Sequence, residues 1–139
     1  MSTRDTISTL KEIYRLWSNG DQEAVSMLLD NLSDDVNWCS IADGCKGAEF
    51  TRERNGVAGV QSYFEELSND WEMIHFTVDE FVCEGERVVM LGSCGWRHRA
   101  SGNSIETPKI DVWKIKDNKI AEFREFYDTA KMMQIVAAT

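Results

Sequence analysis

The sequence predicts an α+β domain in which helices dominate the first half and an antiparallel sheet follows. In residues 7–17 and 57–67, apolar residues recur every three or four positions, which is the spacing of amphipathic helices. After residue 71, apolar and polar residues alternate in four stretches separated by short turns, which indicates an antiparallel meander. Helices and strands that share one core in this order are typical of the α+β class.

The first 41 residues are predicted to form two helices and one strand. The first helix has an apolar face and ends at Asn19-Gly20, a common stop signal. Its apolar face consists of Ile7, Leu10, Ile13, Tyr14 and Trp17. Asp21 is suited to cap a second, shorter helix, which Ser33-Asp34-Asp35 is expected to end. Residues 36–41 then read as a strand.

A polar segment separates this strand from the third helix. Residues 43–55 contain Gly44 and Gly47 and few apolar side chains, so we expect a mobile loop of the kind that roofs pockets. The helix that follows ends at residues 68–70. Its predicted buried face consists of Val57, Val60, Phe64 and Leu67.

The meander is predicted to contain strands at residues 74–82, 88–99, 105–116 and 120–127. Asp117-Asn118 is a candidate tight turn because Asn tolerates positive φ. Pro108 stands early in its strand, which suits a sheet edge or a bulge. Asp128 is suited to cap a short C-terminal helix that carries Met132 and Met133.

Length and composition restrict the protein class. A chain of 139 residues fits one domain, which we place at residues 1–139. With 24 acidic against 15 basic residues, it lacks the basic field that nucleic acid or an anionic membrane requires. No leader or membrane-spanning segment is evident, so we expect a soluble cytoplasmic protein. The four cysteines and two histidines form no metal-binding pattern, and we expect no metal, disulfide or cofactor.

Three short segments resemble the nuclear transport factor 2-like superfamily, in particular its SnoaL-like and ketosteroid-isomerase-like branches. They are residues 17–21 (WSNGD), 34–38 (DDVNW) and 124–128 (REFYD), and the resemblance extends over nearly the whole chain. It implies a cone-shaped roll with three N-terminal helices packed on a curved, mainly antiparallel sheet, a short C-terminal helix and an interior pocket.

Only part of the isomerase active site has counterparts in this sequence. The oxyanion-holding aspartate falls on Asp111, but the isomerase tyrosine falls on Ile13 and the base aspartate on Trp38. With two of three roles empty, steroid isomerisation is not implied. The related epoxide hydrolases use an Asp-Arg-Asp group, of which only Glu125 is a counterpart here, because the other positions fall on Gly92 and Cys94.

Strand alternation places two carboxylates among aromatic residues. Asp111 shares its face with Trp113, and Glu125 shares its face with Phe123 and Tyr127. A turn at 117–118 brings Asp111 beside residues 124 and 125, and the family register turns Glu125 toward the pocket. Two carboxyls in a low-dielectric pocket do not both ionise easily, so one keeps its proton and acts as donor while the other accepts. The alternative is an Asp111–Arg124 ion pair at the rim with a solvated Glu125.

His98 is a third catalytic candidate because its unperturbed pKa lies near neutrality, although a position at the pocket rim is an equal alternative. Aromatic residues predicted on the inner face would stack a flat ligand, or simply form core. The predicted ligand-binding wall consists of Trp38, Cys94, Trp96, Trp113, Phe123 and Tyr127.

Together these features predict a cofactor-independent isomerase, cyclase or lyase acting by general acid-base catalysis on an apolar, carbonyl-bearing or polycyclic molecule. Such a SnoaL-like cyclase needs only one pocket carboxylate, which Asp111 or Glu125 could supply. The alternative is a protein of the same fold that binds a hydrophobic ligand without turnover, or a dimeric scaffold. The outward sheet face is apolar enough to predict a homodimer through Val89, Leu91, Val112 and Phe126.

Overall fold

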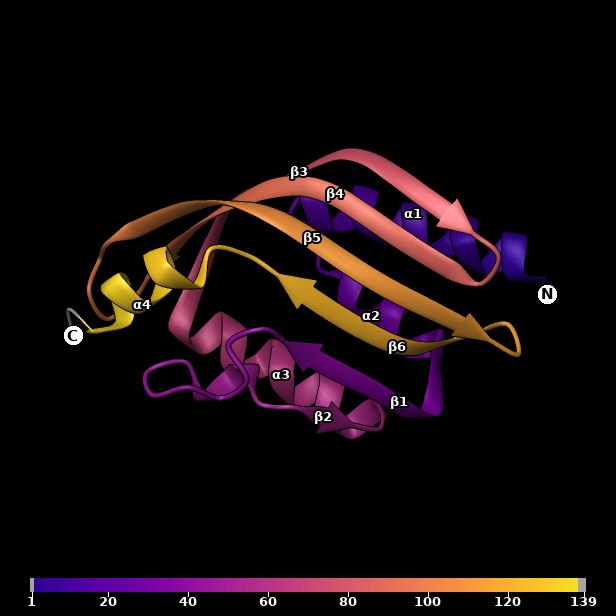
Figure 1. The fold of residues 1–139 in the computed structure, drawn as a ribbon, viewed down its shortest axis with the longest axis horizontal. Coiled ribbons are helices and arrows are strands. Elements are labelled where there is room, and N and C mark those ends of the chain that lie inside the picture. The colour runs from indigo at the N-terminus through magenta and orange to yellow at the C-terminus, as the bar shows by residue number, and fades with distance from the viewer. Residues whose placement is uncertain (1, 138–139) are drawn as a thin grey trace.

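The computed structural model describes residues 2–137, which form four α-helices, one short 3₁₀ helix and a single six-stranded sheet (Figure 1). In chain order the elements are α1 (Thr3–Ser18), α2 (Glu23–Asp30), β1 (Leu32–Ser40), η1 (Glu49–Thr51), β2 (Arg54–Asn55), α3 (Val57–Asp70), β3 (Trp71–Glu84), β4 (Arg87–His98), β5 (Ser104–Lys116), β6 (Lys119–Phe126) and α4 (Thr129–Ala137). None of the helices within the described residues is long and apolar enough to cross a bilayer.

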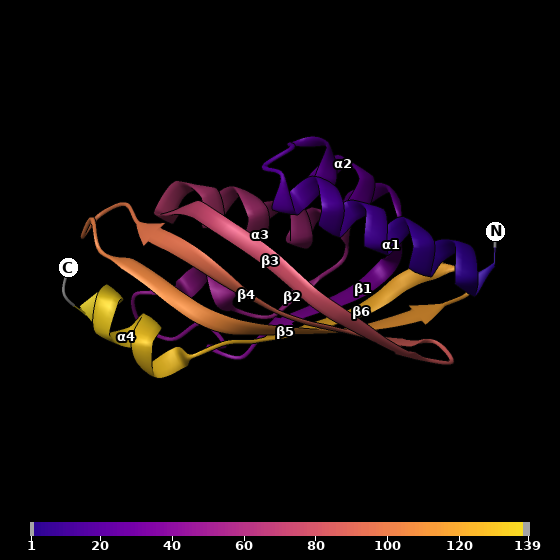
Figure 2. The same cartoon turned by 90° about the horizontal axis from the view of Figure 1, so that it is seen from above.

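The sheet is curved and covered by helices on one face. Its strand order is β2-β1-β6-β5-β4-β3, and all neighbours are antiparallel except β1 and β6, which run parallel. Helices α1, α2 and α3 lie over one face, whereas α4 sits at one end of the sheet (Figure 2). The α+β architecture is therefore confirmed, and the concave face of the sheet encloses the interior under the three helices.

Helix α1 forms where the spacing predicts it. Ser2 and Asp5 make a reciprocal capping box, with Asp5 N donating to Ser2 Oγ at 3.2 Å and Ser2 N donating to Asp5 Oδ2 at 3.0 Å. The buried face includes Leu10, Ile13 and Tyr14. This face holds Tyr14 against the sheet interior.

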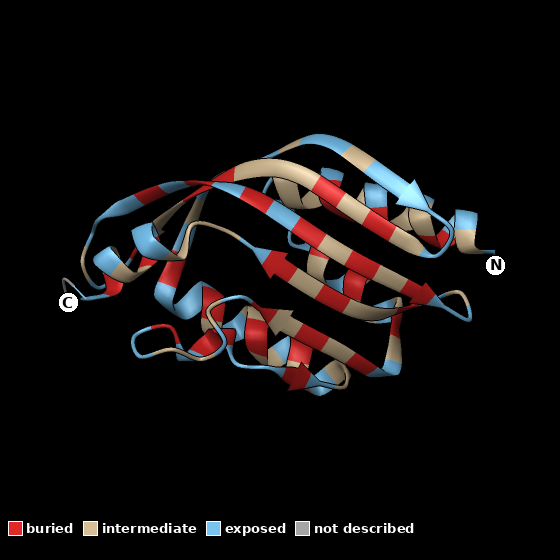
Figure 3. Ribbon diagram, viewed as in Figure 1, coloured by how far each residue is buried: buried red, intermediate tan, exposed pale blue. Residues whose placement is uncertain are grey.

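Strand β5 alternates strictly between buried and outward residues over most of its length (Figure 3). Its buried residues are Ile105, Thr107, Lys109, Asp111, Trp113 and Ile115. Apolar residues occupy both ends of this inward face, and polar residues occupy its middle. The middle of β5 therefore places ionisable side chains in the interior, and both ends of the strand pack into the apolar core.

The polar segments of the first half are more structured than predicted. Residues 33–35 lie within β1 and do not end α2, which already ends at Asp30. Asp34 and Asp35 are exposed, so their carboxylates do not interrupt the strand. Residues 43–55, predicted as a mobile loop, contain η1 and β2. Arg54 is buried there and is paired with Glu66 at 2.8 Å, which compensates its charge. The three helices of the first half are thus not consecutive, since β1, η1 and β2 separate α2 from α3.

The turn and cap predictions of the second half are confirmed. Asp117 and Asn118 adopt positive φ values of 51° and 63° at the β5–β6 turn. Asp128 Oδ1 accepts from the backbone N–H of Lys131 at 3.0 Å at the start of α4. Pro108 lies in an interior strand, but β6 pairs only with residues 110–116, so β5 is locally an edge on that side.

Candidate functional site

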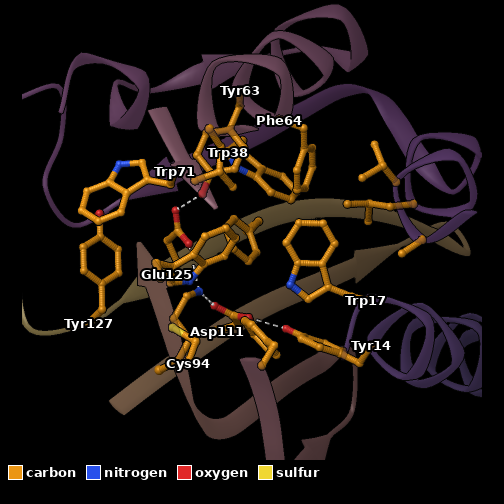
Figure 4. Close-up of a pocket in the computed structure, with 18 of the residues that line it drawn as sticks. Tyr14, Trp17, Trp38, Tyr63, Phe64, Trp71, Cys94, Asp111, Glu125 and Tyr127 are labelled. Atoms are coloured by element: carbon orange, nitrogen blue, oxygen red, sulfur yellow. Dashed lines mark hydrogen bonds and ion pairs between the residues drawn. The ribbon is translucent and has the colours of Figure 1, made fainter. Parts of the chain in front are cut away.

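A cavity of about 120 Å³ lies between the helices and the concave face of the sheet. Its walls are mainly aromatic, and its polar groups cluster on β5 and β6 (Figure 4). All six residues predicted for the ligand-binding wall line it: Trp38, Cys94, Trp96, Trp113, Phe123 and Tyr127.

Asp111 and Glu125 are direct cross-strand partners on β5 and β6. Both line the cavity and are buried, with 3% and 5% of their surface exposed. Arg124 pairs with Val112 instead, and its guanidinium contacts Glu122 on the outward side at 3.4 Å. The rim ion pair between Asp111 and Arg124 is therefore not formed, and Glu125 is not solvated.

Lys109 lies between the two carboxylates. Its Nζ pairs with Asp111 Oδ1 and with Glu125 Oε1, the latter at 2.9 Å. The ammonium also sits 5.6 Å from the centre of the Phe123 ring, within cation–π range. One lysine therefore links both acids in a buried triad.

Two tyrosines from the helices complete the network (Figure 4). The Tyr14 hydroxyl of α1 donates to Asp111 Oδ2 at 2.5 Å and accepts from Trp113 Nε1 at 2.7 Å. The Tyr63 hydroxyl of α3 donates to Glu125 Oε2. Each of the four carboxylate oxygens thus accepts a hydrogen bond from a protein side chain, which holds both acids in fixed positions.

Burial and mutual charge shift the pKa values of this cluster. Burial, reinforced by the charge of Glu125, raises the pKa of Asp111 despite the opposing effect of Lys109. Burial alone would lower the pKa of Lys109, but the two carboxylates outweigh it and the net pKa is raised, so the lysine stays charged. Burial and the adjacent carboxylates raise the pKa values of Tyr14 and Tyr63, which keeps both phenols protonated as donors.

Lys109, Tyr14 and Tyr63 were not predicted as site residues. Lys109 stands two positions before Asp111, so strand alternation already places it on the same face. The family resemblance assigns the tyrosine role to Ile13, which has no hydroxyl, whereas the hydroxyl of the next residue, Tyr14, donates to Asp111. Tyr63 follows Val60 by three positions and so shares the buried face of α3.

His98 lies apart from the cluster. It is not among the residues that line the cavity, although it is buried. Its ring packs on Trp71 at a centroid distance of 4.7 Å, and its Nδ1 is 3.0 Å from Ser101 Oγ in the β4–β5 turn. The structure thus places it at the end of the sheet, with no contact to Asp111 or Glu125.

Across residues 2–137 no group of three or more histidine, cysteine or acidic side chains could hold a metal ion. All four cysteines are free thiols. Cys94 is buried in the cavity wall, and burial raises its pKa to about 11, so it is a neutral thiol and not a nucleophilic thiolate.

The comparisons with known proteins agree with this architecture. A family model of the SnoaL-like domain matches residues 10–123. No curated protein matches the sequence. An NTF2-like protein of unknown function from Burkholderia pseudomallei is 25% identical, with a TM-score of 0.82 over 99% of this chain and 100% of that one.

Two further solved structures share the fold at lower identity. TerC, co-crystallised with polyporic acid, is 19% identical with a TM-score of 0.78, over 95% of this chain and 98% of that one. A protein from Mesorhizobium loti with the description "putative SnoaL-like polyketide cyclase" is 16% identical with a TM-score of 0.71, over 87% of this chain and 97% of that one. The chain belongs to the SnoaL-like domain family, within the NTF2-like superfamily.

Proposed function

We propose that the protein is a cofactor-independent enzyme of the isomerase, cyclase or lyase type, which uses Asp111 and Glu125 for general acid-base catalysis on an apolar carbonyl compound. The observation that supports this proposal best is the pair of buried carboxylates facing one another in an aromatic cavity. Aromatic walls favour a flat, apolar substrate. Two acids side by side on the sheet surface of the cavity can exchange protons with such a substrate.

The proposed roles follow from the shifted pKa of Asp111. Because that pKa is raised, Asp111 holds a proton more readily than an ordinary carboxyl and is suited to donate it to a carbonyl oxygen. Glu125 would take a proton from the carbon next to the carbonyl, which yields an enol, and would return it at another position. Lys109 and the two tyrosines keep both acids in place during this transfer.

Family membership supports the same class of reaction. The Mesorhizobium loti protein carries the description "putative SnoaL-like polyketide cyclase", and TerC was co-crystallised with polyporic acid. Both share the fold of this chain, so an organic molecule in the interior is a reasonable expectation for this protein as well.

The test is to identify what the purified protein carries. Native mass spectrometry followed by denaturing extraction should reveal a bound carbonyl or polycyclic compound, which then serves as the assay substrate. Asp111→Asn should bind this compound but lose turnover by about a hundredfold or more, the usual contribution of a general acid. Glu122→Gln, on the same strand as Glu125 but half-exposed, is the control that should keep full turnover. Unchanged turnover in Asp111→Asn would sink the assignment.

A second candidate is binding without turnover, which one observation favours. All four carboxylate oxygens already accept hydrogen bonds within the protein, as expected of a structural network. Under this alternative, Asp111→Asn and Glu125→Gln change affinity only, and no product forms from the co-purified compound.

We also propose that the outer sheet face pairs two copies of the chain. Ile110 and Phe126 are cross-strand partners there, with 38% and 41% of their surface exposed in the single chain. Val89, Leu91 and Val112 adjoin them through the β4–β5 register. A contiguous apolar face of this kind is typical of a two-fold interface.

A further inference from the structure

The cavity approaches solvent at a small group of aromatic side chains. Most of the residues that line it are buried, and the half-buried ones are Trp17, Val25, Phe64, Trp96 and Tyr127. The centroid of the Trp17 ring lies 5.6 Å from that of Phe64 and 6.2 Å from that of Trp96. We call these three rings, of Trp17, Phe64 and Trp96, the entrance, because here the wall of the cavity is in contact with water.

The exposed part of Trp96 is on the inner side of the sheet. Trp96 shares its face of β4 with Cys94 and His98, since side chains alternate along a strand. Both of these neighbours are buried, with 2% and 6% of their surface exposed. The side chain of Trp96 therefore points toward the interior, and the helices that cover the sheet leave part of its ring open to solvent.

The opposite end of the cavity is closed by α4. Met132 of this helix and Ile105 of β5 line the cavity and are 5% and 7% exposed. Tyr127 is half-buried at this end, on the far side of the cavity from Trp17 in Figure 4. Its hydroxyl is 2.6 Å from Ser40 Oγ, and this hydrogen bond holds the ring in place. A molecule that enters is therefore expected to pass the entrance and not α4.

Trp17 extends from the interior to solvent. Its ring lines the cavity and also packs on Phe76 at a centroid distance of 6.4 Å. Its indole nitrogen makes no hydrogen bond within residues 2–137 and is not among the buried nitrogens without a partner, so it faces water. Trp17 precedes the last residue of α1, and residues 19–23 after the helix are exposed. Ring contacts, and no hydrogen bond, hold this side chain in place.

Trp17 covers the part of the cavity wall that contains Cys94. Cys94 is the cross-strand partner of Phe76, and Trp96 follows it by two residues on the same face of β4. The Trp17 ring packs on both of these aromatic residues. Movement of the Trp17 ring would therefore uncover Cys94, which is buried while the ring stays in place.

We infer that Trp17 controls access to the cavity, and that molecules enter when its ring moves away from Phe64 and Trp96. The passage lies between α1, α3 and β4. Apolar rings bound it, so a charged molecule would lose its water there without compensation, and neutral molecules are favoured. A wider molecule requires a larger movement of the indole, so Trp17 also limits substrate size. This inference goes beyond the proposed function, because it concerns access and not the reaction.

The alkylation rate of Cys94 measures access without any knowledge of the substrate. Iodoacetamide and the bulkier iodoacetanilide are reacted with the protein at about pH 9, where part of the thiol is ionised, and peptide mass mapping follows each cysteine separately. Cys83 is exposed and supplies the intrinsic reactivity of each reagent. Relative to Cys83, Cys94 of the wild type should react with iodoacetanilide at least about tenfold more slowly than with iodoacetamide.

The Trp17→Ala variant tests the role of the indole. Cys94 should be alkylated about tenfold faster or more, because two ring contacts no longer hold the passage closed. The disadvantage of iodoacetanilide should also shrink. Met132→Ala is the matched control, since it removes a buried wall side chain at the opposite end and should leave the rate at Cys94 unchanged.

The urea dependence of the rate distinguishes a local opening from global unfolding. Movement of one side chain exposes little surface, so the wild-type rate at Cys94 should change little below the unfolding transition. A rate that rises steeply with urea in the wild type would mean that Cys94 reacts through unfolding, and would overturn the inference. This measurement decides if Trp17→Ala does not fold.

Two further outcomes would overturn the inference. Faster alkylation of Cys94 in Met132→Ala than in Trp17→Ala would place the passage at α4. Equal rates in Trp17→Ala and the wild type would mean that the indole does not limit access. Both results leave the roles of Asp111 and Glu125 untouched, because those are tested by turnover in Asp111→Asn.

Discussion

At the scale of single residues, the charge of Lys109 is what allows two buried acids to share one cavity. Lys109→Met should destabilise the fold by about 3–5 kcal/mol, because the change removes the only cation paired with two buried carboxylates among the described residues. Urea denaturation at neutral pH measures this. Lys116→Met, at the exposed end of the same strand, should leave the free energy of unfolding within about 0.5 kcal/mol.

The triple variant Lys109→Met, Asp111→Asn, Glu125→Gln separates charge from packing. It should recover much of the stability lost in Lys109→Met, since replacing a whole buried ionic group costs far less than breaking it. A triple variant as unstable as the single one would mean that Lys109 acts through its packing alone.

The raised pKa of Asp111 predicts a pH dependence of stability. A folded-state pKa above the unfolded value contributes stability that is present below the unfolded pKa, near 4, and lost as pH rises through the folded pKa. The stability of the wild type relative to Asp111→Asn should therefore fall as the pH rises above about 4, by about 1.4 kcal/mol per unit of pKa elevation. Urea midpoints at several pH values for both proteins check the sign, and a relative stability that rises with pH contradicts it.

The position of a single residue could be predicted from the sequence where it depends on residues close by in the chain. Asp111, Glu125 and the aromatic wall follow from strand alternation and one turn. The same alternation places Lys109 inward on the face of Asp111, but lysine is rarely buried, so its residue type argues against an interior position. The bonds from Tyr14 and Tyr63 depend on how far each helix stands from the sheet, which packing fixes and no single element encodes.

At the scale of elements, β3 and β4 approach unusually closely at Gly92. A Cβ at this position would lie 2.1 Å from the backbone oxygen of Thr77, beside the register shift between Val78 and Glu80. Gly92→Ala should therefore destabilise the protein by about 1–3 kcal/mol, because the strands must separate or shift. Thermal unfolding measures the loss, and Ser93→Ala on the same strand should have little effect.

The elements themselves were predicted well where their signals are short-range. Helix α1 and the Asp117-Asn118 turn depend on capping and turn chemistry within a few residues. The two-residue strand β2 and the irregular β3–β4 register have no such signal, because they arise from pairing with distant strands. The segment at residues 43–55, predicted as a loop, is mostly turns and irregular structure, and the prediction missed only η1 and β2.

At the scale of the whole molecule, the outer sheet face carries the prediction of a homodimer. Light scattering on a size-exclusion column should give twice the chain mass at micromolar concentration. Phe126→Asp should shift the protein to a monomer, because a charge at the centre of an apolar interface is not compensated. Ile74→Asp changes an exposed residue of the edge strand and should remain dimeric. A monomeric wild type refutes the interface.

The parallel pairing of β1 with β6 has a consequence for how the chain folds. Trp38 faces Phe123 across this pair, and the cavity takes walls from α1 and β1 as well as from the last two strands. The segments around Trp38 and Phe123 must come together before their contact contributes any free energy, so we expect the β1–β6 pairing to form late in folding. During synthesis the ribosome releases the early helices long before β6 exists. Until then Trp38 lacks its stacking partner Phe123, so we expect the nascent chain to expose apolar surface that the folded protein buries.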